Sequence, residues 1–436
     1  MKTGIEIKNR LIEKIESRKA KIVVIGLGYV GLPLAIEFAR NEFEVVGIEI
    51  DRRKIEQLNG GINYLVSDKA KLHEIIGKDK LRATSDYKCL SDADCICICV
   101  PTPLDRHREP DMKYVVDAAE RVSSHLKRGQ LVILESTTYP GTTDGLILPI
   151  LEKSGLEVGS DFFLAFSPER IDPGNPDHNI HNTPRVVGGT TQNCSETVIT
   201  LYSKIISKVY KASSTQVAEM EKLYENIFRA VNIALVNELA LLCKKMDIDI
   251  WEVIELAKTK PYGFLPFYPG PGLGGHCIPI DPFYLTWKAR EYDFNTRFIE
   301  LAGEINTKMP YEISQMIIES LSSQGKCIKG AKIMILGVAY KKDIADYRES
   351  SSLKLLEILQ GKEANVNYND PHIHRVPTNG HFIESTSLND LGEYDCVVIA
   401  TDHSLYDYDK ILEESKLIVD TRNALKIRGN SKVVTL

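Results

Sequence analysis

The apolar positions in the first part of the chain fall into short runs separated by amphipathic stretches. The runs that predict strands are Lys21–Ile25, Glu44–Ile50, Cys95–Val100, Leu131–Glu135 and Phe163–Phe166. An amphipathic stretch at residues 1–20 predicts a lead-in helix, and a second helix is expected over about residues 30–40. Alternation of strands and helices is typical of a parallel sheet covered on both faces.

From about residue 213 the apolar residues recur three and four positions apart, which indicates one long helix. A loop rich in Gly and Pro, FLPFYPGPGLGGHCIPIDP, follows this helix. A second strand–helix–strand unit begins at residues 331–340 and ends near residues 365–371, and strands at Cys396–Ala400 and Leu417–Asp420 continue it. We therefore predict an α/β protein with two Rossmann-like doubly wound domains joined by a long central helix.

Composition and charge narrow the classes of partner. The chain has 60 acidic and 54 basic residues, a net charge of −6 and no domain-sized basic block, which argues against nucleic acid. No apolar run reaches the ~18 residues of a transmembrane helix, and the N-terminus lacks the apolar core of a signal peptide. The nine cysteines are an odd number without secretory context. We expect a cytoplasmic protein with reduced thiols and no membrane partner.

A glycine-rich turn follows the first predicted strand. Gly26, Gly28 and Gly31 match the dinucleotide fingerprint, whose glycines allow a tight turn, close approach of a pyrophosphate and close helix packing. Glu49 ends the next strand, where a carboxylate can accept both ribose hydroxyls of NAD and repel the 2′-phosphate of NADP. The basic residues just beyond, Arg53 among them, can soften that preference. The alternative is a packing turn without a cofactor.

The cysteines fall into two groups. Cys95, Cys97 and Cys99 alternate along one strand and share one face, where apolar packing is favoured over a metal because CxxC spacing is absent. Cys277 instead lies among glycines in GLGGHCIPID, with Asp281 four positions on. A thiol in a glycine loop near a helix start is open to a substrate and prone to ionise. The residues alone leave two interpretations, a nucleophile and a buried loop cysteine.

Polar clusters follow three predicted strands at their carboxyl ends, where open α/β sheets bind ligands. They are VPTP at 100–103, STT at 136–138 with the PGTT that follows, and SPER at 167–170. Ordinary turn chemistry is the alternative. Lys222 and Asn226 lie four positions apart on the long helix and share a face among apolar neighbours. A lysine on such a face is either catalytic or extends its amine to solvent.

Several segments carry a family resemblance in one consistent order: GLGYVGLPLA, VPTP, ESTTYPGTT, SPER, AEMEKLYENIFRAVNIALVNE, PGPGLGGHCIPIDP and GVAYKKDIADYRESSSL. Together they resemble the UDP-glucose/GDP-mannose dehydrogenase family. The resemblance implies an NAD-dependent four-electron oxidation of a nucleotide sugar, from alcohol to carboxylate. It also implies an NAD-binding domain at 1–212, a central helical dimerisation region with the cysteine loop at 213–310, and a UDP-sugar-binding domain at 311–436. A homodimer or a higher homo-oligomer is expected.

The resemblance assigns expected roles to individual residues, and it implies no metal. The expected catalytic residues are Cys277 as nucleophile, Asp281 as its acid/base neighbour, Lys222 and Asn226 at the oxyanion, Thr137 holding a water, and Glu169 in thioester hydrolysis. The expected NAD contacts are Gly26, Gly28, Tyr29, Val30, Gly31, Glu49, Arg53, Pro101, Thr102, Ser136 and Thr137. The expected substrate contacts are Glu169, Arg170, Lys222, Asn226, Tyr268, Gly272, Gly274, Gly275, Lys341 and Arg348, the last two at the UDP moiety.

These roles imply chemistry through a covalent adduct. A base, either Lys222 or a water on Thr137, takes the C6 hydroxyl proton as hydride leaves to NAD. The Cys277 thiolate traps the aldehyde as a thiohemiacetal, and a second hydride transfer gives a thioester. Water activated near Glu169 and Asp281 then releases the uronic acid.

The cysteine loop departs from the UDP-glucose enzymes. Where those typically read GGSCFPKD, this chain reads GGHCIPID, and SPERIDPGN stands where they read more like PEFLREG. Both segments resemble the UDP-N-acetylhexosamine branch, which implies UDP-N-acetylglucosamine as substrate, with Arg170 a candidate partner of the acetamido group. UDP-glucose, UDP-N-acetylmannosamine and UDP-N-acetylgalactosamine are the alternatives. A binding protein without catalysis is disfavoured because the catalytic set is complete, and a two-electron hydroxyacid dehydrogenase has no use for the cysteine loop.

Overall fold

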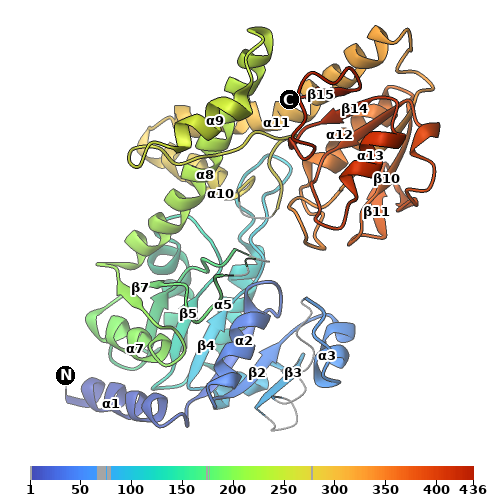
Figure 1. The fold of residues 1–436 in the computed structure, drawn as a ribbon. Coiled ribbons are helices and arrows are strands. Elements are labelled where there is room, and N and C mark those ends of the chain that lie inside the picture. Colours follow the sequence, from blue (N-terminus) through green and yellow to red (C-terminus); the bar gives the residue numbers. More distant parts are fainter. Residues whose placement is uncertain (1, 66–74, 76–79, 173–174, 176, 276–277) are drawn as a thin grey trace. The chain divides into compact units, whose positions relative to one another are not determined.

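The computed structural model describes residues 2–65, 75, 80–172, 175, 177–275 and 278–436. The chain forms two compact units, Met1–Glu225 and Asn226–Leu436, and the boundary between them falls inside one long helix, α8 (Thr215–Lys245) (Figure 1). Each unit has its own sheet and its own buried apolar clusters.

In the described part of the first unit, eight strands form one sheet in the order β3-β2-β1-β4-β5-β6-β7-β8. The strands are β1 Lys21–Ile25, β2 Glu44–Ile48, β3 Leu81–Thr84, β4 Cys95–Ile98, β5 Leu131–Leu134, β6 Phe163–Phe166, β7 Arg185–Gly189 and β8 Val209–Lys211. Neighbouring strands are parallel except β6 and β7, which run antiparallel. The order of the strands in the sheet reverses between the parallel strands β1 and β4, and open α/β sheets bind ligands at the carboxyl ends of strands at such a switch point.

Helices cover both faces of this sheet because successive strand residues point to opposite sides. Cys95 and Cys97 pack with α1, α2 and α7, whereas Ile96 and Ile98 pack with α5 and α6, so the expected burial of the cysteine face is confirmed. The helices are α1 Lys2–Glu16, α2 Gly31–Arg40, α3 Arg52–Asn59, α5 Lys113–His125, α6 Leu148–Leu151 and α7 Gln192–Tyr202. Short 3₁₀ or π turns lie at Tyr87–Asp92, Thr143–Ile147 and Glu152–Ser154.

The second unit holds a smaller parallel sheet in the order β10-β9-β13-β14-β15. Its strands are β9 Lys332–Leu336, β10 Asn365–Asn369, β13 Cys396–Ile399, β14 Ile418–Asp420 and β15 Val433–Thr435, and β11 Arg375–Thr378 pairs with β12 His381–Glu384 as a hairpin. Its other helices are α9 Ile250–Lys258, α10 Asp281–Ala289, α11 Arg297–Ser323, α12 Ser351–Gly361 and α13 Tyr408–Glu414, with 3₁₀ turns at Arg290–Tyr292 and Leu391–Glu393.

Helix α8 is, by length and composition alone, long and apolar enough to cross a membrane. Its contacts favour a core helix instead. Val236 and Ala240 pack with Trp251 in the core of the second unit. The buried amide of Asn237 donates to Oδ1 of Asn306 at 3.0 Å, a polar contact that fits a protein interior.

The predicted α/β class with two doubly wound sheets and a long central helix is confirmed. The strands expected from apolar runs are all present, with ends shifted by one or a few residues. Strands β3, β7, β8, β11, β12 and β15 are not among the expected elements. The division of the chain at residues 212 and 310 stays a prediction.

Candidate active site

The glycine turn after β1 has the geometry of a pyrophosphate cradle. Gly26 has φ +91°, and a Cβ there would come within 2.6 Å of the carbonyl oxygen of Cys99. A Cβ on Gly31 would lie 1.9 Å from the Gly26 oxygen, so helix α2 packs against the turn at a distance that only glycine allows. A Cβ on Gly28 would meet no atom within 4 Å, which leaves space for a ligand beside the helix N-terminus.

Glu49 follows β2 and is buried at the edge of this turn. Its Oε2 accepts the N–H of Leu27 at 3.3 Å, and its Oε1 accepts the N–H groups of Ile50 and Asp51 at 2.8 and 3.2 Å. Lys54 pairs with Oε2 at 3.7 Å, so a ribose hydroxyl would have to share the fourth of the carboxylate's roughly four acceptor positions with this ammonium. These features fit an adenosine diphosphate group of NAD, which the predicted contacts Tyr29 and Val30 flank within the turn.

The other predicted cofactor residues lie at the carboxyl edge of the same sheet or close to it. Ser136 follows β5 and donates its hydroxyl to the Val100 carbonyl at 2.7 Å, which joins the segments that carry Thr102 and Thr137. Arg53 pairs with Asp51 at 3.3 Å. Pro101 is exposed beside the buried Thr102.

The carboxylate of Glu169 accepts hydrogen bonds from three donors. Its Oε1 accepts the N–H groups of Arg170 and Ile171 at 2.7 and 2.9 Å. Its Oε2 accepts from Nη1 of Arg185 at 3.1 Å. The carboxylate is therefore fixed in position and orientation within the first unit.

Arg170 binds helix α8. Its guanidinium pairs with Glu225 through Nε at 3.1 Å and through Nη2, contacts Glu221 at 3.4 Å, and donates to the carbonyl of Pro184 at 2.9 Å. Burial, together with the charge of Glu225, raises the pKa of Glu221 to about 7. Because every guanidinium nitrogen is engaged, an acetamido group would have to share Arg170 with these partners.

Lys222 is buried on α8, with 8% of its surface exposed. One turn earlier, the buried Glu219 accepts the N–H groups of Gly141 and Thr143 at 2.6 and 2.8 Å. These bonds tie the segment after Thr137 to α8, close to the lysine in sequence. Within the part of the chain that the structure describes, no hydrogen bond or ion pair engages the Lys222 ammonium. Its charge acts on Glu221 and Glu225 and favours a lower pKa of each carboxyl, and a buried cation is also suited to an anionic ligand group.

In the second unit, Asn226 and Asp281 are brought together. The amide Nδ2 of Asn226 donates to Oδ2 of Asp281 at 2.5 Å, and both side chains are buried. Asp281 is the first residue of α10, which agrees with the expected helix start after the cysteine loop. His276 and Cys277 lie outside the described residues.

The glycines before Cys277 pack on the segment that carries the predicted UDP contacts. A Cβ on Gly274 or Gly275 would come within 2.5 or 2.9 Å of the side chain of Tyr340, next to Lys341. The N–H of Gly275 donates to the carbonyl of Arg348 at 3.0 Å. The predicted cysteine loop and the predicted UDP residues are therefore neighbours within one unit.

Gly272 adopts φ +131°, and a Cβ there would lie 3.0 Å from Ser351, so this part of the loop also requires glycine. The Arg348 guanidinium pairs with Asp346, with Nη2 to Oδ2 at 2.7 Å. Tyr268 stacks on Trp251 with ring centroids 6.1 Å apart and donates its hydroxyl to Glu255 at 2.7 Å.

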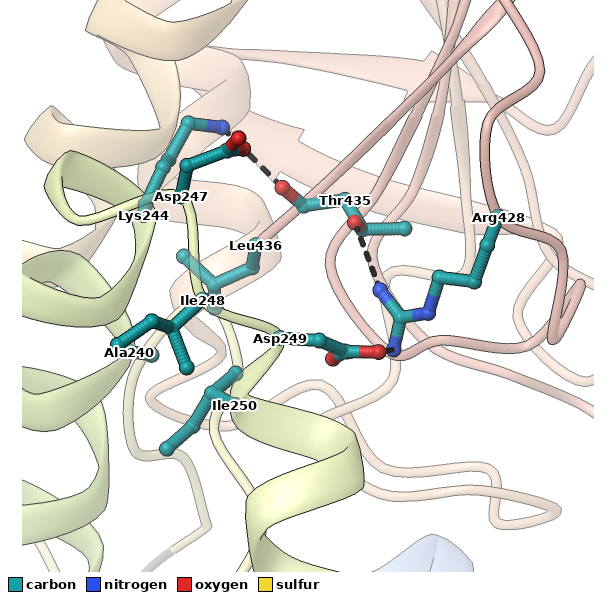
Figure 2. Close-up of a pocket in the computed structure, with 9 residues that line it drawn as sticks. All are labelled: Ala240, Lys244, Asp247, Ile248, Asp249, Ile250, Arg428, Thr435 and Leu436. Carbon is teal, nitrogen blue, oxygen red and sulfur yellow. Dashed lines mark hydrogen bonds and ion pairs between the residues drawn. The ribbon is translucent and has the colours of Figure 1, made fainter.

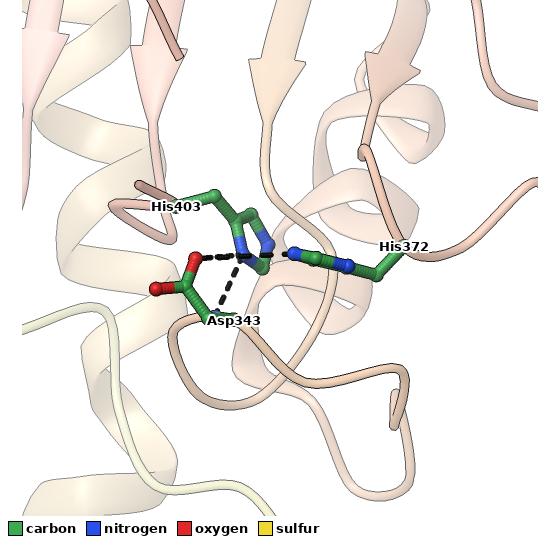
Figure 3. Close-up of side chains that lie close together, drawn as sticks. All are labelled: Asp343, His372 and His403. Atoms are coloured by element: carbon green, nitrogen blue, oxygen red, sulfur yellow. Dashed lines mark hydrogen bonds and ion pairs between the residues drawn. The ribbon is translucent and has the colours of Figure 1, made fainter. Parts of the chain in front are cut away.

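Asp343, His372 and His403 lie close together beside the Lys341 segment (Figure 3). Their hydrogen bonds favour a structural role over a metal site. Nε2 of His403 pairs with Asp370 at 3.1 Å, and its Nδ1 accepts the N–H of Asp343 at 2.9 Å, so both ring nitrogens are engaged. The Asp343 carboxylate accepts the N–H and the hydroxyl of Ser404 at 2.8 and 2.6 Å. These hydrogen bonds attach the loop between β9 and α12 to the segment after β13.

Two of the cavities among the described residues lie within the second unit. One, of about 670 Å³, is lined by Tyr268, Trp251, Asp402, Arg422 and neighbouring residues. The other, of about 260 Å³, lies between α8, the turn before α9 and the C-terminus, where Arg428 pairs with Asp249 (Figure 2). None of the predicted site residues lines this second cavity, as the nine residues in Figure 2 show.

Three parts of the chain match the domains of one family. Residues 20–206 match the NAD-binding domain of the UDP-glucose/GDP-mannose dehydrogenase family, residues 216–308 its central domain, and residues 334–427 its UDP-binding domain. The chain belongs to this family. It is an NAD-dependent nucleotide-sugar dehydrogenase, an oxidoreductase whose UDP-binding domain supports a UDP-sugar substrate.

Named relatives of this dehydrogenase cover nearly its whole length. Protein CapL of Staphylococcus aureus is 37% identical over 93% of this chain and 96% of its own. A UDP-N-acetyl-D-glucosamine 6-dehydrogenase of Pseudomonas aeruginosa is 36% identical over 88% of this chain and 90% of its own. The solved structure of a UDP-N-acetylmannosamine dehydrogenase from Pyrococcus horikoshii superimposes with a TM-score of 0.85 at 34% identity, covering 94% of this chain and 96% of that one.

Sequence reasoning missed three charged residues of the dehydrogenase at or near the predicted contacts. Glu135 and Arg185 are buried next to Glu169, and Arg422 lines the larger cavity of the second unit. Glu135 and Arg422 follow strands β5 and β14, so the rule that pointed to the other strand ends could have found them. Arg185 begins β7, and no sequence signal shows that this strand runs antiparallel.

Proposed function

We propose that this dehydrogenase oxidises C6 of a UDP-N-acetylhexosamine to the carboxylate, with UDP-N-acetylglucosamine as its substrate. The observation that carries this substrate is the cysteine loop, GGHCIPID, read with SPERIDPGN. The relative named UDP-N-acetyl-D-glucosamine 6-dehydrogenase from Pseudomonas aeruginosa supports it. The names of protein CapL and of Cap5O from Staphylococcus aureus support a place in surface polysaccharide biosynthesis.

The first oxidation needs a base at the C6 hydroxyl and an acceptor for hydride. A bound NAD would supply the hydride acceptor for each of the two oxidations, one NAD for each hydride. Lys222, or a water held by Thr137, takes the hydroxyl proton. The buried position of Lys222 supports either role, because a neutral amine is a base and an ammonium stabilises an alkoxide.

The second oxidation proceeds on the enzyme as a covalent adduct. The thiolate of Cys277 adds to the aldehyde carbon, and loss of a second hydride from the thiohemiacetal leaves a thioester. Asn226 donates to the oxyanion, and its bond to Asp281 at 2.5 Å supports a fixed direction for that donor. Water attacks the thioester with Glu169 and Asp281 as the acid/base groups.

The binding residues divide between the two nucleotides. Gly26, Gly28, Gly31 and Glu49 would hold NAD, and the space beside Gly28 supports this assignment. Lys341 and Arg348 would hold the UDP part of the substrate, and the packing of the loop of Gly272, Gly274 and Gly275 on the segment that carries them supports this assignment.

A second candidate substrate is UDP-N-acetylmannosamine. The relative with TM-score 0.85 bears that name, and so does a curated relative that is 36% identical over 93% of this chain. Both candidates carry a 2-acetamido group and differ in the configuration at C2. The same pocket chemistry therefore serves both, and only a rate comparison separates them.

The test is NADH formation with a panel of UDP sugars. The panel holds UDP-N-acetylglucosamine, its manno and galacto isomers, and UDP-glucose, each with NAD and with the uronate identified by mass spectrometry. We expect UDP-N-acetylglucosamine to react fastest and to yield two NADH per sugar. Faster reaction of the manno isomer would transfer the assignment to the second candidate, and one NADH per sugar would contradict a four-electron reaction.

We also propose a cytoplasmic homodimer or higher homo-oligomer, built on α8. Apolar residues with large exposed fractions recur along this helix at helical spacing (Val217, Met220, Tyr224, Phe228, Leu235, Leu239 and Leu242), and Met246 follows just past its end. Contiguous exposed apolar surface of this kind supports a protein interface. Light scattering after size-exclusion chromatography tests it, and a monomer at all concentrations would contradict it.

A further inference from the structure

A buried arginine lies at the edge of the first sheet where the ligand residues gather. Arg185 is the first residue of β7, and β7 runs antiparallel to β6 with Phe166 opposite Gly188. An antiparallel strand begins where its neighbour ends. Arg185 therefore reaches the carboxyl ends of β5 and β6, next to Glu135 and Glu169.

Every nitrogen of the Arg185 guanidinium is engaged. Nε donates to the hydroxyl of Ser167 at 2.8 Å, Nη1 to Oε2 of Glu169 at 3.1 Å, and Nη2 to Oε2 of Glu135. The ring of Tyr202 lies 4.6 Å from the guanidinium carbon, and its hydroxyl donates to Oε1 of Glu135. The Arg185 and Glu135 side chains are 3% and 0% exposed.

The charges in this cluster are unequal, because one cation faces two carboxylates. Burial raises the pKa of Glu135 to about 8, with Glu169 adding to the rise and Arg185 opposing it. Arg185 thus pairs with both carboxylates, Glu169 at the ligand edge and the fully buried Glu135.

The described residues leave Glu169 one direction in which to accept a further hydrogen bond. Of about four acceptor positions on a carboxylate, two on Oε1 are taken by the N–H groups of Arg170 and Ile171, and one on Oε2 is taken by Arg185. Among the described residues, these three donors hold its plane and leave one lone pair of Oε2 for a water.

We propose that Arg185 is a positioning residue for hydrolysis: it fixes Glu169 so that Oε2 accepts an O–H of the attacking water, and Glu135 and Tyr202 fix Arg185. This rests on the proposed function, in which Glu169 acts on a thioester. In that step the water oxygen forms a bond to the carbonyl carbon and the C–S bond breaks. One water proton returns the sulfur to the thiol, and the other is released as the acid ionises, with no change of oxidation state.

The first test is Arg185→Lys, which keeps a positive charge but removes the fork that spans both carboxylates. The probe is the UDP sugar that the unaltered enzyme oxidises fastest, with excess NAD, in rapid mixing. We expect two NADH per active site at close to the normal rate, followed by turnover at least tenfold slower. Mass spectrometry of the quenched protein should show an acyl adduct. Arg128→Lys, in an exposed ion pair with Asp161, is the matched control.

The second test uses Tyr202→Phe, which can be measured even if Arg185→Lys does not fold. Tyr202→Phe retains the ring under the guanidinium and removes only the hydroxyl that binds Glu135. We expect the same adduct with a turnover loss of at least threefold, against no loss in Tyr210→Phe on β8. A purely structural role would lower all steps by one factor and leave no adduct, and that result would overturn the proposal.

A third variant separates positioning from an independent effect. Arg185→Lys combined with Glu169→Gln should turn over no more slowly than Glu169→Gln alone, because Arg185 acts only through Glu169. If the double variant instead lost turnover by the product of the two single losses, the proposal would be overturned. Absence of NADH from the unaltered enzyme with every UDP sugar would refute the proposed function and this inference with it, whereas normal NADH with unaffected variants would refute the inference alone.

Discussion

The side-chain amide of Asn226 donates to Oδ2 of Asp281 at 2.5 Å in the interior of the second unit. Asn226 lies on α8 and Asp281 opens α10, so the bond ties the long helix to the helix that follows the cysteine loop. One amide N–H is used by the carboxylate. The other keeps a fixed direction, which is what a donor to a developing oxyanion requires.

Asn226→Ala should lower kcat by about a hundredfold, which is typical for the loss of one oxyanion donor. The KM for NAD should change little, because the amide does not lie in the glycine turn. Asn232→Ala, on the same helix with its amide bonded to the Phe228 carbonyl, is the control and should be near normal. An equal effect of both variants would point to helix stability instead.

The enzyme should prefer NAD to NADP because of Glu49. A 2′-phosphate would meet a buried carboxylate that already accepts the N–H of Leu27. The measurement is kcat/KM with each cofactor, for the unaltered enzyme and for Glu49→Gln, which should narrow the preference. Glu44→Gln, at an exposed pair with Lys21, should leave it unchanged. Equal use of NADP by the unaltered enzyme would remove Glu49 from this role.

Arg348→Ala should raise the KM for the UDP sugar roughly tenfold and leave the KM for NAD unchanged. Loss of one charged contact of about 1.4 kcal/mol corresponds to that factor. Arg375→Ala on the β11–β12 hairpin, where the guanidinium covers Phe382, is the control. A change in the NAD KM alone would contradict the division of the two nucleotides between the units.

Cys277→Ser should block the second oxidation more than the first. A serine hydroxyl stays protonated near neutral pH, whereas a thiol has a reference pKa of about 8.5 and ionises readily. Overall turnover should fall by several orders of magnitude, with aldehyde or its adduct detected by mass spectrometry. Near-normal formation of uronate by the variant would mean that an aldehyde hydrate is the second substrate.

Glu135 should make stability depend on pH. Burial raises its pKa in the folded protein from 4.5 to about 8. The folded state therefore holds the proton more tightly, and the free energy of unfolding is lost as pH rises from about 5 to 8, by at most ~1.4 kcal/mol per pH unit from this group. The urea midpoint of Glu135→Gln should vary less over this pH range than that of the unaltered protein. The urea midpoint of the control Glu152→Gln, at an exposed position, should vary as in the unaltered protein. If the urea midpoint changed equally with pH in the unaltered protein and in both variants, the raised pKa of Glu135 would be contradicted.

Local sequence features predicted the parts of the site that depend on a short stretch of chain. Gly26, Gly31 and Glu49 belong to one strand–helix–strand unit, so their geometry follows from backbone rules. The helical spacing of Lys222 and Asn226 likewise predicted a shared, buried face.

The contacts around Arg185 depend on chain direction and are not visible in the sequence. Arg185 meets Glu169 only because β7 pairs antiparallel with β6, and a parallel strand would carry it to the opposite edge. The bond between His403 and Asp370 joins ends of β13 and β10 that are separated by β9. Such contacts require the strand order, which apolar runs do not encode.

Helix α8 continues unbroken past the boundary at Glu225, with Lys222 on one side of it and Asn226 on the other. A rise of about 1.5 Å per residue sets the two side chains about 6 Å apart along the axis. The backbone hydrogen bonds of this helix therefore fix the distance between Lys222 and Asn226 along its axis. The spacing stays the same for as long as this turn of α8 remains helical.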